Sequence, residues 1–229
     1  IVIDPIPGGT SMAFNETATH TITGTAGSNA FGSDQLITAD LAISGGEDNE
    51  NAGQSSIVVG SNIVNNAAEL AAFGKTHNIS SQSTHSLVAG AANTVDGSKN
   101  VVGGKDHTIT ADTSAVFGAT NDVSGLGHLV SGSGNQVSGE LGFFGGLDNT
   151  CSTDFSIIAG EGNSVTADHG TAFGKSNSVT GQYSTAMGVD TIASGVTSFA
   201  AGFTALASGG NSVAMGNNPI ASNTGAVDI

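Results

Sequence analysis

The stretch that decides the fold is residues 171–216, which read TAFGKSNSVTGQYSTAMGVDTIASGVTSFAAGFTALASGGNSVAMG. Glycine recurs in it every fourteen residues, at Gly174, Gly188, Gly202 and Gly216. A mostly apolar trio precedes each glycine, as in Phe199-Ala200-Ala201, and a small or polar residue, most often serine, precedes the trio. A fixed period of this kind decides the whole architecture, so the chain is an array of repeated units.

The same spacing extends over most of the chain. One step of sixteen, from Gly74 to Gly90, interrupts it, and the two extra residues, around Ser81-Gln82-Ser83, are expected to loop out of the array. The structural glycines of the repeat are Gly32, Gly46, Gly60, Gly74, Gly90, Gly104, Gly118, Gly132, Gly146, Gly160, Gly174, Gly188, Gly202 and Gly216.

Each repeat divides into two half-units. A second pattern stands three and five residues after the marker glycine, as at Asn163 and Val165, and a further glycine often follows at the seventh position. Two strands of about five residues and two tight corners use up such a repeat and leave no room for a helix. Glycine at the corners provides a positive φ or lets successive backbones approach closely. The sequence therefore predicts an all-β parallel β-solenoid of about fourteen 14-residue coils.

The two half-units differ in how much apolar surface they carry. After the marker glycine, apolar and mixed positions alternate, which is typical of a strand with one buried and one wet face. Before the glycine, neighbours such as Ile57, Val58 and Val59 are all apolar. A thin roll buries only one face of that strand, so a continuous apolar stripe remains and predicts side-by-side oligomerisation.

Composition excludes several classes of partner. The 229 residues carry a net charge of −15, with four lysines and no arginine, so the chain repels phosphate backbones and anionic leaflets. We therefore expect neither nucleic acid binding nor direct membrane contact by this fragment. No basic n-region and no run of about 18 apolar residues occurs. Any export signal or membrane anchor of the native protein is expected in parts outside this sequence.

Catalytic and metal-binding motifs are weak. No nucleophile elbow occurs, and the partial matches to a phosphate loop or a dinucleotide fingerprint are explained by the glycines of the repeat. We therefore predict no enzyme activity, no catalytic residue and no cofactor site. We also predict no metal site, because no two histidines share a ligand spacing, although a metal or pH-switch role stays open as the alternative. The histidines fall on repeat positions: His77 and His107 replace asparagine, His128 replaces serine, His85 and His169 lie five before the glycine, and His20 precedes the array.

Two other residue types have a structural interpretation. Aspartate recurs two residues after the marker glycine, where it favours a turn; a calcium ion shared by Asp34 and Asp48 is the alternative. Cys151 stands where neighbouring coils have valine or isoleucine, which predicts a buried, inert thiol rather than a nucleophile or an interchain bridge.

The end of the array resembles a known family. Asn211-Ser212-Val213-Ala214-Met215-Gly216, with Ser184-Thr185-Ala186-Met187-Gly188, resembles the Asn-Ser-Val-Ala-Ile-Gly head repeat of the YadA-like trimeric autotransporter adhesins. The resemblance extends roughly over residues 28–222 and implies a left-handed parallel β-roll. It also implies a homotrimer of side-by-side rolls, with one strand layer lining the trimer core. Between Gly90 and Gly174 the coils depart from the family by having Asn-x-Val in place of Ala-x-Ala.

This resemblance implies a function and a division of the chain. It implies a non-enzymatic, extracellular adhesin head on the bacterial surface that attaches multivalently to matrix proteins, host cells or glycans. The alternative is the receptor-binding or structural head of a viral or phage fibre, on the virion surface. Residues 1–27 are then an N-terminal cap, 28–222 the head repeats, and 223–229 a tail. The sequence assigns no ligand-binding residues.

Overall fold

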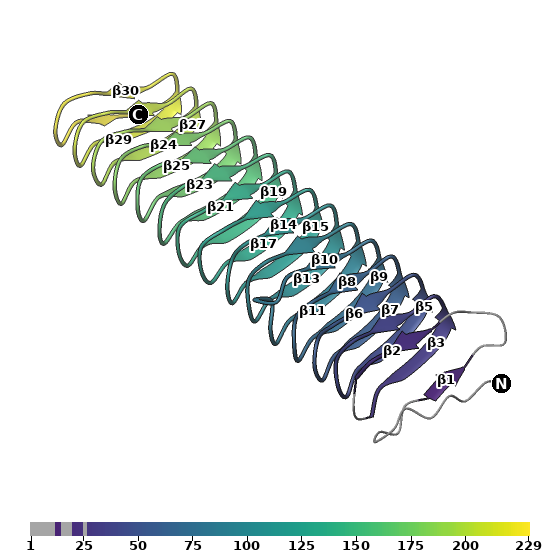
Figure 1. Ribbon diagram of the computed structural model, residues 1–229. Helices are drawn as coiled ribbons and strands as arrows, with labels where there is room; N and C mark the ends of the chain where they lie inside the picture. Colours follow the sequence, from purple (N-terminus) through teal and green to yellow (C-terminus); the bar gives the residue numbers. More distant parts are fainter. Residues whose placement is uncertain (1–11, 15–19, 25–26) are drawn as a thin grey trace. The chain divides into compact units, whose positions relative to one another are not determined.

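The computed structural model describes residues 12–14, 20–24 and 27–229, which contain strands, turns and bends but no helix. The chain divides into two compact units, Ile1–Ala119 and Thr120–Ile229. In each unit, long strands of mostly five residues alternate with strands of two residues (Figure 1). Together the units hold about fifteen turns, so the predicted all-β parallel solenoid is confirmed.

The first unit has two parallel sheets, one of long and one of short strands. Its long strands are β1 (Met12–Phe14), β3 (Asn29–Ser33), β5 (Ile43–Glu47), β7 (Ile57–Ser61), β9 (Ala71–Lys75), β11 (Leu87–Ala91), β13 (Val101–Lys105) and β15 (Ala115–Ala119). Its short strands are β2 (Thr21–Ile22), β4 (Leu36–Ile37), β6 (Glu50–Asn51), β8 (Val64–Asn65), β10 (Asn78–Ile79), β12 (Thr94–Val95) and β14 (Thr108–Ile109). Each strand pairs in parallel with the strand one turn later.

The second unit repeats this arrangement. Its long strands are β17 (Leu129–Ser133), β19 (Phe143–Leu147), β21 (Ile157–Glu161), β23 (Thr171–Lys175), β25 (Thr185–Val189), β27 (Phe199–Phe203), β29 (Val213–Asn217) and β31 (Val227–Asp228). Its short strands are β16 (Asp122–Val123), β18 (Gln136–Val137), β20 (Thr150–Cys151), β22 (Ser164–Val165), β24 (Ser178–Val179), β26 (Ile192–Ala193), β28 (Leu206–Ala207) and β30 (Ile220–Ala221).

Each turn buries side chains from both sheets. In the turn that contains β21 and β22, Ile158 and Val165 are completely buried, as is their counterpart in nearly every other turn. Asn163, between the two strands, is also buried. The interior is therefore a narrow column of aliphatic side chains with a polar row beside it. The prediction that the third and fifth positions after the glycine share the inner face is confirmed.

The marker glycines lie near the end of each long strand. At Gly160 φ is +128°, a value that L side chains rarely adopt, and a Cβ there would lie 1.8 Å from the carbonyl oxygen of Gly174 in the next turn. These glycines therefore allow successive backbones to approach closely. The left-handed corner residue itself lies two positions later and is often not glycine, as at Asp148 with φ 53°. Aspartate and asparagine tolerate this conformation better than most residues.

Two expectations about the repeat need correction. The strands after the glycine have two residues rather than about five, because the left-handed corner residue precedes them closely and the second corner follows at once. The number of turns is about fifteen rather than about fourteen. Strands β1 and β2 add a turn that pairs with β3 and β4, and Phe14 of β1 is followed by Asn15 rather than by a marker glycine.

The structure describes the predicted tail completely and the predicted cap only in part. Of the cap at 1–27, residues 1–11, 15–19 and 25–26 lie outside the described residues. In the tail at 223–229, β31 pairs with β29 through Val227 and Val213, so the long-strand sheet continues to that point. The two inserted residues leave the ladder in the corner between Ile79 and Leu87, where the Ser83 hydroxyl donates to Val95 O at 2.7 Å.

Candidate functional site

The most extensive feature of the surface is the outer face of the long strands. Alternate residues of each strand point outward, and in the single chain they remain open to solvent. Large apolar side chains on this face are 36–47% exposed. In the first unit they are Phe31, Ile57, Phe73, Leu87, Val101 and Phe117, and in the second Leu129, Phe143, Ile157, Phe173, Met187 and Met215.

Small residues lie next to large ones on this face. The ring of Phe31 lies over Gly45 of the next turn, where a Cβ would be 2.0 Å from the ring. Phe117 covers Gly103 in the same way, with a Cβ-to-ring distance of 3.0 Å. The rings thus cover glycines of neighbouring turns, where no other side chain fills the space.

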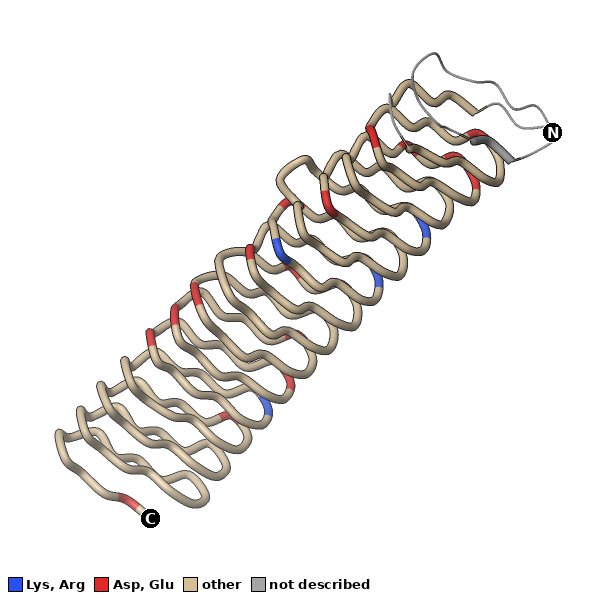
Figure 2. The backbone as a smooth tube through the Cα atoms, turned by 90° about the horizontal axis from the view of Figure 1, so that it is seen from below, with Lys and Arg blue, Asp and Glu red and all other residues tan. Residues whose placement is uncertain are grey.

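Charge is absent from the centre of this face. The positions one and three residues before the marker glycine hold no charged residue in any described turn from β3 onward, and charges begin one residue after the glycine. Lys75, Lys105 and Lys175 all stand at that position, and Lys175 pairs with Glu161 at 3.0 Å. Figure 2 shows the charged residues gathered mostly along the edges of the turns. The apolar face is thus bordered by charge but not interrupted by it.

One hollow opens on this face in the first unit. Ala71 lies between Ile57 and Leu87 in the row of outward side chains, and its small size leaves a cavity of about 460 Å³. The Glu69 carboxylate and the His85 ring contact each other at its rim. The lining is mostly apolar, so the hollow belongs to the same apolar face.

The outer face of the short strands has the opposite character. In the first unit polar side chains cover it at Thr94 and Thr108, and in the second from Asp122 to Thr180, where a shallow hollow of about 280 Å³ lies beside Asp122, Gln136 and Thr150. Later in the second unit, Ile192 and Ile220 are 42% and 61% exposed on this face. The long strands thus present an apolar face and the short strands a mostly polar one, as expected when only one of them is covered.

A polar ladder runs inside the roll. The Asn163 side-chain amide donates to Asn149 Oδ1 at 3.0 Å and to Gly174 O at 2.9 Å, while its backbone N–H donates to the same Asn149 oxygen at 3.0 Å. Asn177 repeats this pattern on Asn163. Every polar atom of these amides has a partner, so the ladder fixes each turn on its neighbour.

Three histidines are buried at repeat positions, as the sequence predicts for His77, His107 and His128. Asn93 N–H donates to His77 Nδ1 at 3.3 Å, and His77 Nε2 lies 3.0 Å from Phe73 O. The neutral ring satisfies both contacts, and burial lowers the pKa of His77. Burial also lowers the pKa of His128, whose Nε2 lies 2.9 Å from Ser124 O. These residues act as members of the interior.

The other candidate residues lie apart from one another. His85 and His169 are exposed at the corners, and Cys151 is a buried free thiol inside the column. Asp34 and Asp48 occupy left-handed corner positions. Within the described residues, no group of three or more histidine, cysteine or carboxylate side chains is arranged to hold a metal ion.

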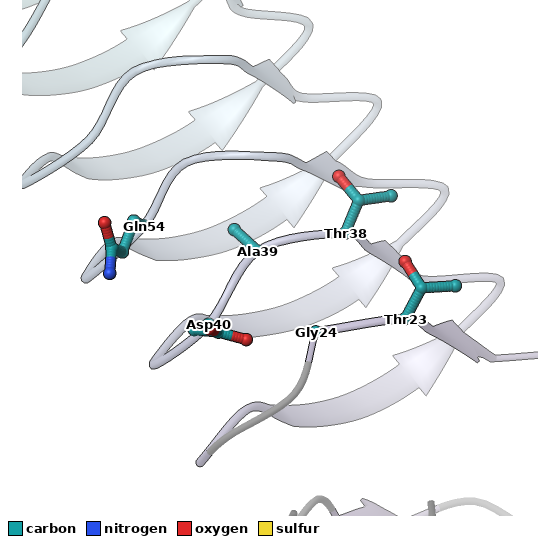
Figure 3. Close-up of a pocket in the computed structure, with 6 residues that line it drawn as sticks. All are labelled: Thr23, Gly24, Thr38, Ala39, Asp40 and Gln54. Atoms are coloured by element: carbon teal, nitrogen blue, oxygen red, sulfur yellow. The ribbon is translucent and has the colours of Figure 1, made fainter.

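A further hollow, of about 370 Å³, lies at a corner of the first unit (Figure 3). Thr23, Gly24, Thr38 and Ala39 line it along two successive turns, and Asp40 and Gln54 lie at its other end. Asp40 is its one acidic side chain, so the hollow holds no pair of carboxylates for acid–base chemistry.

Sequence reasoning missed one arrangement. His169 was placed by the repeat, but the aromatic rings that lie on either side of it were not. Phe155 and His169 stack with centroids 5.0 Å apart, and His169 and Tyr183 are 4.6 Å apart. All three stand at the same position of successive turns, five residues before the marker glycine, and reading that column of the repeat would have revealed them.

Comparison with known proteins gives one match and one negative result. Residues 166–191 and 193–218 each match the YadA head domain repeat, and these copies fall on the turns of β23 to β29. No curated protein matches the chain. Among the described residues, no helix is long and apolar enough to cross a membrane. These two copies, within a series of turns that mostly share their period, support a YadA-like head domain.

Proposed function

We propose that this chain is the head of a trimeric autotransporter adhesin, displayed on a bacterial surface, which attaches the cell to matrix proteins, other cells or glycans. The match to the YadA head repeat supports an adhesin-type function. Within the proposal, residues 28–222 are the head, 1–27 cap it and 223–229 lead out of the last turn. The function involves binding alone and no catalytic step.

The observation that carries the proposal is the uncharged apolar face of the long strands. A single roll leaves this face in water in both units, and such an extended patch is unusual for a soluble monomer. Three rolls that turn these faces toward a common axis cover all of them at once. The hydrophilic faces of the short strands then point outward, and repeated turns offer many equivalent weak contacts.

Attachment is tested with beads coated with the whole chain. We expect them to adhere to at least one surface from a panel of matrix proteins, glycan arrays and cultured cells, above the level of albumin-coated beads. Monomeric protein on the beads should hold less firmly than the assembled form, because avidity depends on simultaneous contacts. Adhesion no stronger than albumin on every surface contradicts the proposed function.

A further inference from the structure

One edge of the second unit carries large exposed side chains at a position where they are energetically unfavourable. Five residues before the marker glycine, the backbone is left-handed, with φ 53° at Leu141, 55° at Phe155, 60° at His169 and 58° at Tyr183. Other turns share this φ and hold residues of different size there, among them Leu41, Ser55 and Lys99, but no other described turns place three stacked rings in succession. We call the four residues from Leu141 to Tyr183 the aromatic edge.

These residues are unfavourable in two independent ways. Residues with bulky side chains seldom adopt a positive φ. Large apolar side chains that stay exposed to water also contribute no burial free energy to stability. Leu141, Phe155 and Tyr183 are 52%, 48% and 54% exposed. The positive φ belongs to the repeat, because Leu41, Ser55 and Lys99 share it, so the side chains rather than the backbone set this edge apart.

A row of acidic side chains runs directly beside the aromatic edge. Glu140, Asp154 and Asp168 each precede one of its members, and backbone hydrogen bonds hold the row in place. Glu140 N–H donates to Asp154 Oδ1 at 2.9 Å, and Asp154 N–H donates to Asp168 Oδ1 at 3.3 Å. Lys175, the sole lysine of the second unit, lies at another position of the turn, next to Glu161. We call these three acids the carboxylate row.

The stacking geometry narrows the class of ligand. Because Phe155, His169 and Tyr183 stack in succession, both faces of the His169 ring and one face each of Phe155 and Tyr183 are occupied. A sugar ring or a nucleobase needs an open aromatic face, so it finds little to stack on. The carboxylate row and the net charge of −15 repel anionic ligands. A cationic side chain with an aliphatic stem fits both features.

We propose that the aromatic edge and the carboxylate row together bind a basic, extended peptide segment of a partner protein. Lysine or arginine stems lie across the ring edges while their charged ends pair with Glu140, Asp154 and Asp168. Backbone hydrogen bonds from Phe155 N–H to Glu140 O and from His169 N–H to Asp154 O, at 2.8 and 3.0 Å, fix the corner backbone. The corner therefore loses little conformational freedom on binding. This inference rests on the proposed attachment function and names the chemistry of one partner.

The test measures binding of a synthetic peptide of alternating lysine and leucine to the whole chain in its assembled form. A peptide with glutamate for lysine is the matched control. We expect the basic peptide to bind at least about tenfold more tightly than the acidic one, and rising salt to weaken it. No binding of the basic peptide, or equal binding of both, overturns the proposal.

Variants locate the binding. Phe155→Ser with Tyr183→Asn places residues that other turns tolerate at this position, and Asp154→Asn with Asp168→Asn keeps the oxygen that accepts each backbone hydrogen bond. Each pair is expected to weaken binding about tenfold, whereas Asp122→Asn on the short-strand face has no effect. Unchanged binding in both pairs, or an equal loss in Asp122→Asn, overturns the proposal.

Four further outcomes are decisive. Dissociation of the assembly by Phe155→Ser with Tyr183→Asn shows that the edge contacts a second copy and overturns the proposal. Tighter binding of a neutral oligosaccharide, lost in the same variant, assigns the edge to sugars and also overturns it. If beads coated with the variant adhere as well as wild-type beads, the proposed attachment function is retained, but the aromatic edge is not the site of attachment. If wild-type beads bind the basic peptide but adhere to no surface, the result supports peptide binding at the aromatic edge and contradicts the attachment function.

Discussion

At the scale of single residues, the interior accepts polar side chains only where each atom has a partner. The sequence repeat predicts correctly that His77 replaces an asparagine of the inner row. It does not predict the protonation state, which depends on Asn93 N–H meeting Nδ1 and on Phe73 O meeting Nε2. The His77 ring is neutral because the interior offers it one donor and one acceptor.

This environment makes stability depend on pH. Burial lowers the pKa of His77 below its ordinary value of 6.5. At a pH between the folded-state pKa and 6.5, the unfolded chain therefore binds more protons than the folded one. Stability is therefore complete above about pH 6.5 and falls as the pH drops toward the folded-state pKa. His128 adds to the same loss.

We expect His77→Asn to reduce the acid-induced loss of stability, because asparagine is the ladder's usual residue and does not titrate. The measurement is the melting temperature of wild type and variant from about pH 7.5 to pH 5. His85→Gln, which removes an exposed histidine, is the control and should follow the wild type more closely. Parallel curves for wild type and His77→Asn would show that His77 is not protonated on unfolding.

At the scale of elements, the period of the glycines predicts the architecture but does not predict the lengths of the strands. The two-residue strands depend on left-handed residues such as Asp148, and aspartate in a sequence does not show which φ it adopts. The turn that holds β1 was missed because β1 falls outside the fourteen-residue period, since Phe14 pairs with Phe31, seventeen residues later, and no marker glycine follows it. The stack of Phe155, His169 and Tyr183 depends on distances between turns, which no single repeat displays.

The close approach of successive turns predicts different results for two glycines of one corner. Gly160→Ala places a Cβ 1.8 Å from Gly174 O at φ +128°, and it should cost about 3 kcal/mol or more of unfolding free energy. Gly162→Asn, two residues later, should cost less than about 1 kcal/mol, because φ is +65° and the nearest atom is 3.8 Å away. Urea unfolding measures both, and equal stabilities would contradict the role assigned to Gly160.

At the scale of the whole molecule, the sequence showed an apolar excess before each glycine, and the structure shows where it lies. Val58 faces inward and is fully buried, whereas Ile57 beside it is 40% exposed. The outward members form one uncharged face in each unit. Which ligand the head binds does not follow from this pattern, because the ligand contacts are not part of the repeat.

Assembly through this face is the central claim, and light scattering tests it most directly. The wild-type chain should have about three times the monomer mass of 22.3 kDa. Phe143→Lys with Ile157→Lys, on neighbouring long strands, should yield smaller species, because burying two charges in an apolar contact is costly. Thr150→Lys with Ser164→Lys, on the short strands of the same turns, should leave the mass unchanged. A wild-type chain that scatters as a monomer, with its apolar faces in water, would contradict the account.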